Sequence, residues 1–230
     1  SAASDVYKRQ DVRSVMGALI YLVKTKLPEY IGTSPFEIQV LTPMRKGELG
    51  VEHLNEVLQY YLNPASESKK EKEGRTGVFR EGDKVMQVKN NYKLEWKITN
   101  AKGFSVEEGL GVFNGDMGVI KQINTYSERI TVVFDENREV EYPYSNLDEL
   151  ELAYAITIHK SQGSEYPAVV LPLLSGPPIL CNRNLLYTAI TRAQKCAAIV
   201  GRQSMVEQMI HNETEQKRYS GLNECLKDGI

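Results

Sequence analysis

Apolar residues near the start of the chain recur at helical spacing, and a strand pattern follows them. Between Val12 and Leu27 they return every three or four positions, which predicts an amphipathic helix. Turn residues follow at 32–35, and the run 37–42 predicts a short apolar strand. A glycine-containing loop then leads to a second helix with inward positions Val51, Leu54, Leu58 and Leu62. A strand, a loop and a helix in this order are typical of an α/β sheet.

The middle of the chain has the pattern of a small β-barrel or sheet. Residues 63–75 are rich in Pro, Ser, Glu and Lys and predict an exposed linker. From 76 to about 147, short runs are punctuated by the turn signals Gly82-Asp83 and Asn114-Gly115. Residues 130–134 and 140–142 predict a hairpin across a polar turn at 135–138. A strand of alternating sides is also predicted, with Val85, Gln87 and Lys89 on one side and Met86 and Val88 on the other.

Helix and strand patterns alternate again beyond Asp148. They predict a helix through His159 that ends at Gly163, strands at 168–171 and 196–200, and helices at 184–194 and 205–210. The β module is therefore an insertion whose two ends should lie close together. We predict an α/β domain in two parts, 11–64 and 149–212, with a linker at 65–75, an inserted β-barrel at 76–148 and a C-terminal tail at 213–230.

Composition sets wide limits on function. The chain has 230 residues, is 41% hydrophobic and carries a formal net charge of −2. It can bury a core, and any nucleic-acid surface must be a local cluster of basic residues. Cys181, Cys196 and Cys225 lack metal-ligand spacing, which indicates reduced thiols and predicts a cytoplasmic location. No apolar run approaches the ~20 residues that span a bilayer, so no membrane association is expected.

A single arginine ends the otherwise apolar helical run 185–193. Residues three and four apart share a helix face, so Thr188 and Arg192 should point together. The apolar positions that can pack inward are Leu185, Leu186, Ala189 and Ile190. An arginine in this place either binds an anion or complements the negative end of the helix dipole. The residues alone leave both interpretations open.

Two further segments carry groups that bind phosphates. Thr157, His159 and Lys160 offer a hydroxyl, a ring donor and a charge at a predicted helix end, and Gly163 permits close backbone approach. The alternative is a capped helix with exposed polar residues. Arg45 and Lys46 follow a strand and face a helix N-terminus, which favours an anion site, although basic residues are also common in solvated loops.

A phosphate-binding P-loop is missing from the sequence. No G-x-x-x-x-G-K-[ST] segment occurs, because His159 stands before Lys160-Ser161 where the last glycine would be. Residues 130–136 mimic the magnesium-binding Walker B strand, but the predicted hairpin explains them better. This chain by itself is therefore not a complete P-loop ATPase.

Together, the runs TIHKSQGSE at 157–165 and YTAITRA at 187–193 resemble motifs V and VI of superfamily 1 helicases in their RecD-like branch. Residues 42–51, followed by Leu54-Asn55, resemble motif IV of the same branch. Residues 79–92 and 112–118 resemble the SH3-like domain inserted in the second motor domain of these enzymes. The resemblance implies an α/β, RecA-like domain of the P-loop NTPase type, without a Walker A segment and with a small SH3-like β-barrel inserted.

The resemblance also implies roles for these residues in an ATP-dependent helicase that moves 5′ to 3′ on single-stranded DNA. Arg192 becomes the arginine finger, Arg45 a second contact to the γ-phosphate, and Gly163 and Glu165 lie near the nucleotide. Thr157, His159 and Lys160 become contacts to single-stranded DNA. ATP and Mg²⁺ would be held by an N-terminal RecA-like domain of the same protein, so this piece alone should bind neither and be inactive. Subunits of a nuclease complex are further possible partners.

The β module interleaves basic and aromatic residues, a pattern that suits stacked bases and bound phosphates. These residues are Lys89, Tyr92, Lys93, Trp96, Lys97, Lys102 and Phe104. We predict DNA contacts for Lys89, Tyr92, Lys93 and Trp96, with a place in the barrel core as the alternative for Trp96. The alternative function for the whole chain is a non-catalytic nucleic-acid-binding module on an α/β scaffold.

Overall fold

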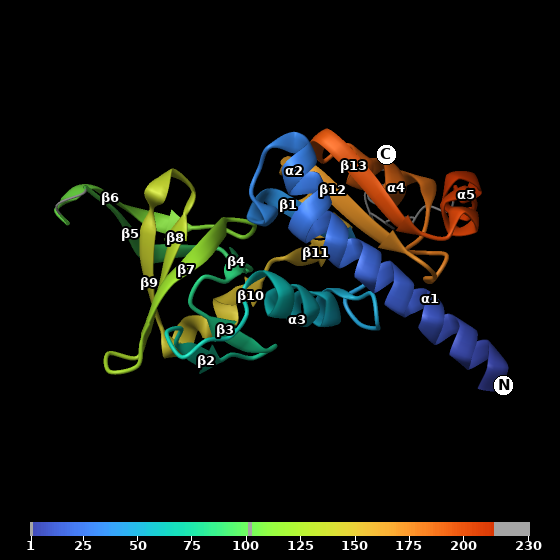
Figure 1. The fold of residues 1–230 in the computed structure, drawn as a ribbon. Helices are drawn as coiled ribbons and strands as arrows, with labels where there is room; N and C mark the ends of the chain where they lie inside the picture. The colour runs from blue at the N-terminus through green and yellow to red at the C-terminus, as the bar shows by residue number, and fades with distance from the viewer. Residues whose placement is uncertain (1, 101–102, 214–230) are drawn as a thin grey trace, which may run out of the picture.

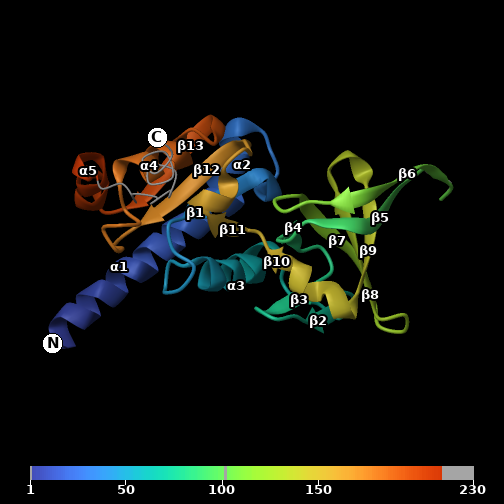
Figure 2. The ribbon, with the colours of Figure 1, turned by 180° about the vertical axis from the view of Figure 1, so that it is seen from behind.

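The computed structural model describes residues 2–100 and 103–213, with side chains from residue 11 onward in the first helix. An α/β domain and an inserted β domain lie side by side (Figures 1 and 2). The α/β domain is built on four parallel strands, in spatial order β11 (Ala155–Thr157), β1 (Ile38–Thr42), β12 (Tyr166–Leu173) and β13 (Ala193–Gly201). The predicted fold class, an α/β domain with a β insertion, is confirmed, and the sheet of the α/β domain is parallel.

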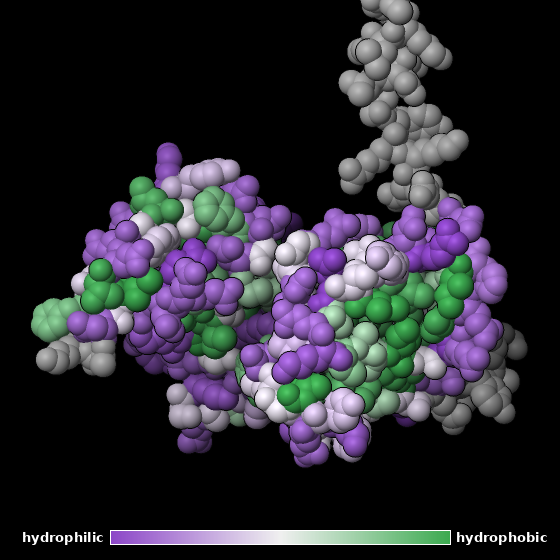
Figure 3. Space-filling view, turned by 90° about the horizontal axis from the view of Figure 1, so that it is seen from above, coloured by the Kyte–Doolittle hydropathy of each residue, from purple (hydrophilic) through white to green (hydrophobic). Residues whose placement is uncertain are grey.

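Helices cover both faces of the parallel sheet. They are α1 (Ala2–Tyr21), the π-helical η1 (Leu22–Lys26), α2 (Leu27–Ile31), α3 (Val51–Leu62), α4 (Arg183–Ile190) and α5 (Gln203–His211). Alternate strand residues face opposite sides, so Val40 packs in one core cluster with α1 and α3, while Leu41 packs in another with α4 and α5. The surfaces of the two domains also differ. Figure 3 shows a continuous hydrophobic area on the α/β domain and scattered hydrophobic patches on the insert.

The first predicted helix is confirmed and continues beyond its predicted start and end. Val15, Leu19, Val23 and Leu27 are buried at a spacing of four residues. Gly32 follows α2 with a φ of 69°, and its backbone N–H donates to the carbonyl of Pro28. This left-handed residue ends the helix because only glycine adopts that conformation without steric cost.

The segment around His159 differs from the predicted helix. Residues 155–157 form strand β11, and the 3₁₀ helix η5 (Ile158–Ser161) follows it. The run is apolar because Ala155 and Ile156 are buried in the parallel sheet. The sequence pattern of such a buried strand cannot be distinguished from that of a buried helix. In addition, α4 ends at Ile190 rather than at Gln194, and Ile190 itself is exposed.

The inserted domain is an open sheet of seven strands. In spatial order they are β10 (Leu150–Leu152), β4 (Lys84–Gln87), β7 (Met117–Asn124), β8 (Arg129–Phe134), β9 (Glu139–Pro143), β5 (Asn91–Thr99) and β6 (Ser105–Val112). No strand pairing between β10 and β6 closes a barrel within the described ranges, so the expected closed barrel is corrected to an open sheet. The predicted hairpin is confirmed as β8 and β9, with Val132 opposite Val140 across the turn η3 (Asp135–Asn137).

One local expectation for the insert needs correction. Part of the predicted linker forms a strand, since β2 (Glu71–Glu73) pairs antiparallel with β3 (Val78–Arg80). The predicted strand with Val85 and Met86 on opposite sides is present as β4, and both of its sides are buried because it lies between the two domains. Val85 packs in the same cluster as Val40, while Met86 packs in the same cluster as Leu41. A strand that serves two cores has no exposed face.

Buried polar groups join the two domains where the chain enters and leaves the insert. Asp83 accepts hydrogen bonds from Gln59 (2.6 Å) and Asn63 (2.7 Å) of α3, and from the hydroxyl of Tyr154 (2.9 Å). Burial raises the pKa of Asp83 above its ordinary value, although these donors oppose the shift. Lys84 donates to the carbonyl of Phe36 (2.7 Å), and burial lowers the pKa of its ammonium group to about 8.

Two 3₁₀ helices complete the described chain, η2 (Pro35–Glu37) before β1 and η4 (Tyr144–Glu149) before β10. Among the helices described, none combines the length and apolar character that crossing a membrane requires. Lys102, Cys225 and residues 214–230 of the predicted tail lie outside the described residues.

Candidate functional site

Arg192 lies directly after the cap of α4, at the start of β13. The side-chain oxygen of Asn182 accepts from the backbone N–H of Leu185 and begins α4, and Thr191 caps its end. The Arg192 guanidinium group donates to the carbonyls of Thr188 (Nε, 3.3 Å) and Ser164 (Nη1, 3.3 Å) and to the hydroxyl of Thr191 (Nη2, 3.4 Å). All three acceptors are neutral, and none of the ion pairs found among residues 2–100 and 103–213 includes Arg192.

The residues just before β12 lie beside Arg192. The backbone N–H of Tyr166 donates to the carbonyl of Arg192 (2.9 Å), and Tyr166 pairs with Ala193 where β12 and β13 begin. Glu165 is exposed and accepts from the Gln194 side chain at 3.3 Å. The structure therefore brings Glu165 and Arg192 together at the amino ends of two neighbouring strands.

Thr157 is the last residue of β11, and His159 and Lys160 lie in η5, which follows it. The hydroxyl of Thr157 accepts from the backbone N–H of Lys160 (3.3 Å) and so caps η5. His159 is exposed and Lys160 is half-buried. Gly163 has a φ of 87° in the following turn, where a side chain would meet no neighbour but would strain the backbone. The capped, polar structure given as the alternative interpretation is therefore present, and it leaves His159 accessible.

Glu151 joins Arg45 to Lys160. Its Oε1 atom lies 3.0 Å from Arg45 Nη2, and its Oε2 atom lies 3.0 Å from Lys160 Nζ. Burial favours the neutral acid, but hydrogen bonds from the two cations outweigh it and lower the pKa of Glu151 below its ordinary value. Glu151 is therefore ionised at neutral pH, and one carboxylate holds two basic residues.

The two arginines expected to contact one phosphate lie at opposite ends of the parallel sheet. Arg45 follows the carboxyl end of β1, where Thr42 pairs with Thr157. Arg192 precedes the amino end of β13. In the register of the parallel strands, the amino end of β13 lies at the opposite end of the sheet from the carboxyl end of β1. The structure brings Arg45 to Lys160 and does not bring it to Arg192.

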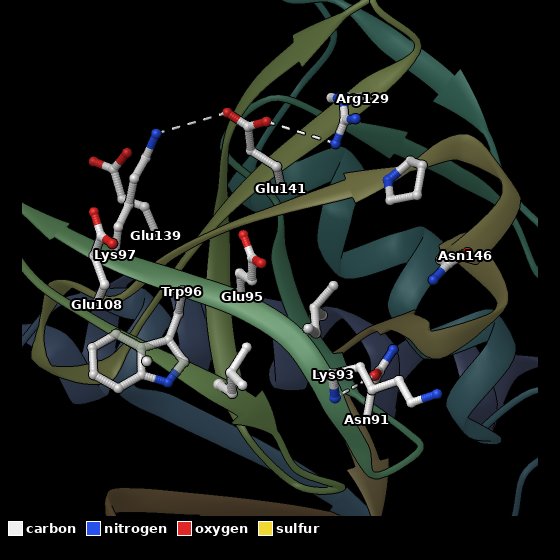
Figure 4. Close-up of a pocket in the computed structure, with 14 residues that line it drawn as sticks. Asn91, Lys93, Glu95, Trp96, Lys97, Glu108, Arg129, Glu139, Glu141 and Asn146 are labelled. Carbon is white, nitrogen blue, oxygen red and sulfur yellow. Dashed lines mark hydrogen bonds and ion pairs between the residues drawn. The ribbon is translucent and has the colours of Figure 1, made fainter.

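The basic and aromatic residues of the insert are spread over its surface. Lys89 forms an ion pair with Asp148. Tyr92 is 69% exposed, and its ring meets Phe113 edge-on with centroids 5.6 Å apart. Lys93 is exposed beside a groove of about 790 Å³ (Figure 4). The charged residues that line this groove are Lys93, Glu95, Lys97, Glu108, Arg129, Glu139 and Glu141. With more carboxylates than cations, the groove is not a basic channel for DNA.

Trp96 lines the same groove (Figure 4) and rests against the body of the insert. It is half-buried beside the main core cluster, opposite Gly109 on β6 and Val140 on β9. A Cβ atom at Gly109 would lie only 2.3 Å from the Trp96 ring, so glycine is what allows this contact. The guanidinium carbon of Arg138 lies 5.9 Å from the ring centroid. These contacts support the alternative interpretation of Trp96 as a core residue.

Two protein-family models match this chain. The SH3 domain of ATP-dependent RecD-like DNA helicases matches residues 54–134, and the UvrD-like helicase C-terminal domain matches residues 152–200. The ATP-dependent RecD2 DNA helicase of Deinococcus radiodurans is 40% identical over 160 residues, which cover 70% of this chain and 19% of that protein. The chain belongs to the RecD-like helicases.

Two further matches cover more of this chain at lower identity. The RecBCD enzyme subunit RecD of Mycolicibacterium smegmatis is 30% identical over 191 residues, covering 83% of this chain and 29% of that protein. The chain thus spans less than a third of the length of these relatives. A Pif1 helicase from Bacteroides, solved with ADP-AlF3 and single-stranded DNA, aligns at 18% identity and a TM-score of 0.47 over 83% of this chain and 46% of its own.

Some polar residues of this RecD-like chain were missed by sequence reasoning. Glu151 stands in a short acidic and apolar run, and its partner Arg45 lies 106 residues away. Asp83 looks like an ordinary turn residue, and the turn itself is present, since its N–H donates to the carbonyl of Arg80. Neither position has a sequence motif that could have indicated its contacts. The described residues contain no group of three or more His, Cys, Asp or Glu side chains arranged to hold a metal ion.

Proposed function

We propose that this RecD-like chain is the second motor domain, with its SH3-like insert, of an ATP-dependent helicase that moves 5′ to 3′ on single-stranded DNA. The observation that carries the proposal is the guanidinium group of Arg192. It is partly exposed and held by three neutral oxygen atoms, so its charge is oriented without being compensated. An oriented arginine of this kind stabilises negative charge on a phosphate during hydrolysis.

The nucleotide would contact the domain at the amino ends of β12 and β13. Arg192 would reach the γ-phosphate, while Glu165 and the backbone at Gly163 would lie next to the nucleotide. Because this chain has no P-loop, an N-terminal RecA-like domain of the same protein would hold ATP and Mg²⁺. When bound, the Mg²⁺ ion would neutralise charge on the β- and γ-phosphates. The role of this chain is to add one fixed positive charge from the opposite side.

Single-stranded DNA would run along the other end of the sheet and across part of the insert. His159 and Lys160 lie there with Thr157, which orders their loop. Arg45 lies with these residues, which favours a DNA contact for it over the nucleotide contact suggested by the resemblance. On the insert, Lys89, Lys93 and the exposed ring of Tyr92 are the accessible candidates, while the packing of Trp96 makes it the weakest.

We propose domain boundaries in which the α/β domain is interrupted by the insert. The predicted α/β parts at 11–64 and 149–212 flank the linker at 65–75 and the insert at 76–148, and the tail begins at 213. Because β10 pairs with β4, we extend the insert to Leu152. Partners would be single-stranded DNA and the N-terminal motor domain. Because several relatives are named as RecD subunits of RecBCD enzymes, subunits of a nuclease complex are a further class of partner.

The test is the Arg192→Ala variant of the protein as its gene encodes it. DNA-stimulated ATP hydrolysis should fall by about 10³-fold or more, while affinity for single-stranded DNA stays nearly constant. Arg192→Lys should restore little of the rate, since an ammonium group lacks the planar fork of guanidinium. Turnover of Arg192→Ala within about threefold of wild type would disprove the role of finger. A non-catalytic binding module, the second candidate, predicts that no variant of the full protein hydrolyses ATP.

A further inference from the structure

One carboxylate connects two cations that come from separate parts of the chain. Arg45 lies in the loop after β1, Lys160 lies in η5 after β11, and Glu151 lies in β10, where the chain leaves the insert. Each oxygen atom of Glu151 serves one cation, at 3.0 Å in both cases. Glu151 therefore fixes the position of both side chains at the same time.

The two cations also have matching positions on neighbouring strands. Thr42 at the end of β1 pairs with Thr157 at the end of β11, and each cation stands three residues beyond its threonine. Because β1 and β11 are parallel, Arg45 and Lys160 both lie beyond the carboxyl ends of these strands, at the same end of the sheet. The backbone brings the two residues close, and Glu151 adds the charge that keeps their mutually repelling groups together.

Charge and exposure leave the pair able to bind an anion. By themselves, Arg45, Lys160 and Glu151 carry a net charge of +1; Glu52 and Glu56 also line the depression beside Arg45, without an ion pair to either cation among the described residues. The side chains of Arg45 and Lys160 are 44% and 27% exposed, while that of Glu151 is 21% exposed. The guanidinium and ammonium groups have five and three N–H donors respectively, and Glu151 occupies only one side of each.

We infer that Glu151 is a positioning residue, which holds Arg45 and Lys160 as one two-cation site for a backbone phosphate of single-stranded DNA. The inference rests on the proposed function, because it takes the strand to run past Lys160. A phosphate bound here would accept from both cations, whose geometry is set before DNA arrives. The ordering cost of two long side chains is then met by the protein fold and not by binding.

The sign of the effect of Glu151→Gln separates positioning from simple charge. The substitution removes one negative charge near DNA, so a purely electrostatic effect would tighten binding and steepen its salt dependence. A positioning role predicts the opposite result. The variant should bind a fluorescein-labelled oligothymidylate about fivefold or more weakly than wild type, and the salt dependence of its affinity should not increase. The measurement is fluorescence anisotropy over a salt series, with the protein as its gene encodes it.

Glu52→Gln is the matched control. Glu52 lines the same small depression as Arg45 and Glu151, and no ion pair joins its side chain to either cation in the described chain. Its loss removes the same charge without removing a contact, so affinity should stay the same or rise slightly. Melting curves of both variants report folding. If Glu151→Gln lowers the melting temperature, Glu151→Asp supplies a charged variant with a shorter reach, which should bind with intermediate affinity.

A double-mutant cycle shows whether Glu151 acts through the cations. In the background of Arg45→Ala with Lys160→Ala, adding Glu151→Gln should no longer weaken binding, because no cation is left for it to position. Tighter or unchanged binding by Glu151→Gln in the wild-type background overturns the inference while leaving the DNA contact intact. If Lys160→Ala and Arg45→Ala themselves leave affinity unchanged, the DNA contact of the proposed function fails and the inference fails with it.

Discussion

The hydroxyl of Tyr154 donates a 2.9 Å hydrogen bond to Oδ1 of Asp83, across the junction between the parallel sheet and the inserted sheet. Tyr154 belongs to the segment that leaves the insert, and Asp83 belongs to the segment that enters it. Two residues of α3, Gln59 and Asn63, donate to the same carboxylate. The buried carboxylate therefore fixes both connections against one helix, and the insert should move with the α/β domain.

Asp83→Ala should destabilise the protein by about 3 kcal/mol or more, because it leaves several buried donors without an acceptor. The donors are the side chains of Gln59, Asn63 and Tyr154 and the backbone N–H of Arg80. Urea unfolding measures the change. The control is Asp148→Ala, which removes an exposed partner of Lys89 and should cost less than about 1 kcal/mol. Equal losses for the two variants would contradict a special role for Asp83.

Lys84 predicts an unusual dependence of stability on pH. Burial lowers the pKa of its ammonium group from 10.5 to about 8. Between these values the unfolded chain binds more protons than the folded chain, so the contribution of Lys84 to stability rises with pH from about 8 to about 10.5. Compared with Lys84→Met, the wild-type free energy of unfolding should increase by up to about 1.4 kcal/mol per pH unit in this window. Parallel pH profiles for the two proteins would contradict the shifted pKa.

Local patterns predicted those parts of the fold that local packing decides. Val15, Leu19, Val23 and Leu27 are buried at the predicted helical spacing, and the hairpin of β8 and β9 has its predicted partners. The short apolar run at Ala155 was assigned the wrong element, because a strand buried on both faces has no alternation to separate it from a buried helix.

The candidate site was predicted only where a motif lies within one segment of sequence. The surroundings of Arg192 come mainly from α4 and the loop before β12, both within the quoted runs. The pairing of Arg45 with Lys160 depends on Glu151, which lies 106 residues from Arg45 and becomes its neighbour only through the fold. Trp96 could not be assigned to core or surface until Gly109 was found opposite it.

The isolated chain should not hydrolyse ATP above background, even with saturating single-stranded DNA. The reason is chemical, since no segment of the sequence forms the backbone cradle that holds a triphosphate. A phosphate-release assay with Mg²⁺ measures this directly. Weak nucleotide binding is compatible with the prediction because Arg192 attracts phosphate, whereas robust magnesium-dependent turnover by the purified chain would contradict the need for a second motor domain.

Lys160→Ala should weaken binding of single-stranded DNA by a similar factor for every sequence. One phosphate contact on a single strand contributes about 0.7 to the slope of log affinity against log salt, and the variant should lose about that amount. Lys195→Ala is the control, because Lys195 is an exposed lysine of β13, whose amino end lies at the opposite end of the sheet. A loss that differs strongly between oligothymidylate and oligoadenylate would indicate base recognition instead of phosphate binding.

Tyr92→Ala and Trp96→Ala should have different effects, because the two rings have different surroundings. Tyr92 is 69% exposed and supported edge-on by Phe113, so it is available to stack on a base. Its loss should weaken single-strand binding by roughly 1 to 3 kcal/mol with little change in salt dependence, since stacking releases no counterions. Trp96 lies against Gly109 and the core, so its loss should mainly lower the melting temperature.

The control for both aromatic variants is Tyr126→Ala. Tyr126 is 98% exposed in the turn between β7 and β8 and should affect neither affinity nor melting. Anisotropy titrations with oligothymidylate and thermal unfolding of the same samples give the two measurements side by side. If Trp96→Ala loses DNA affinity while its melting temperature stays constant, the ring contacts DNA despite its packing. If Tyr92→Ala binds like wild type, the insert offers no stacking platform at this position, and only the phosphate contacts near Lys160 remain for the strand.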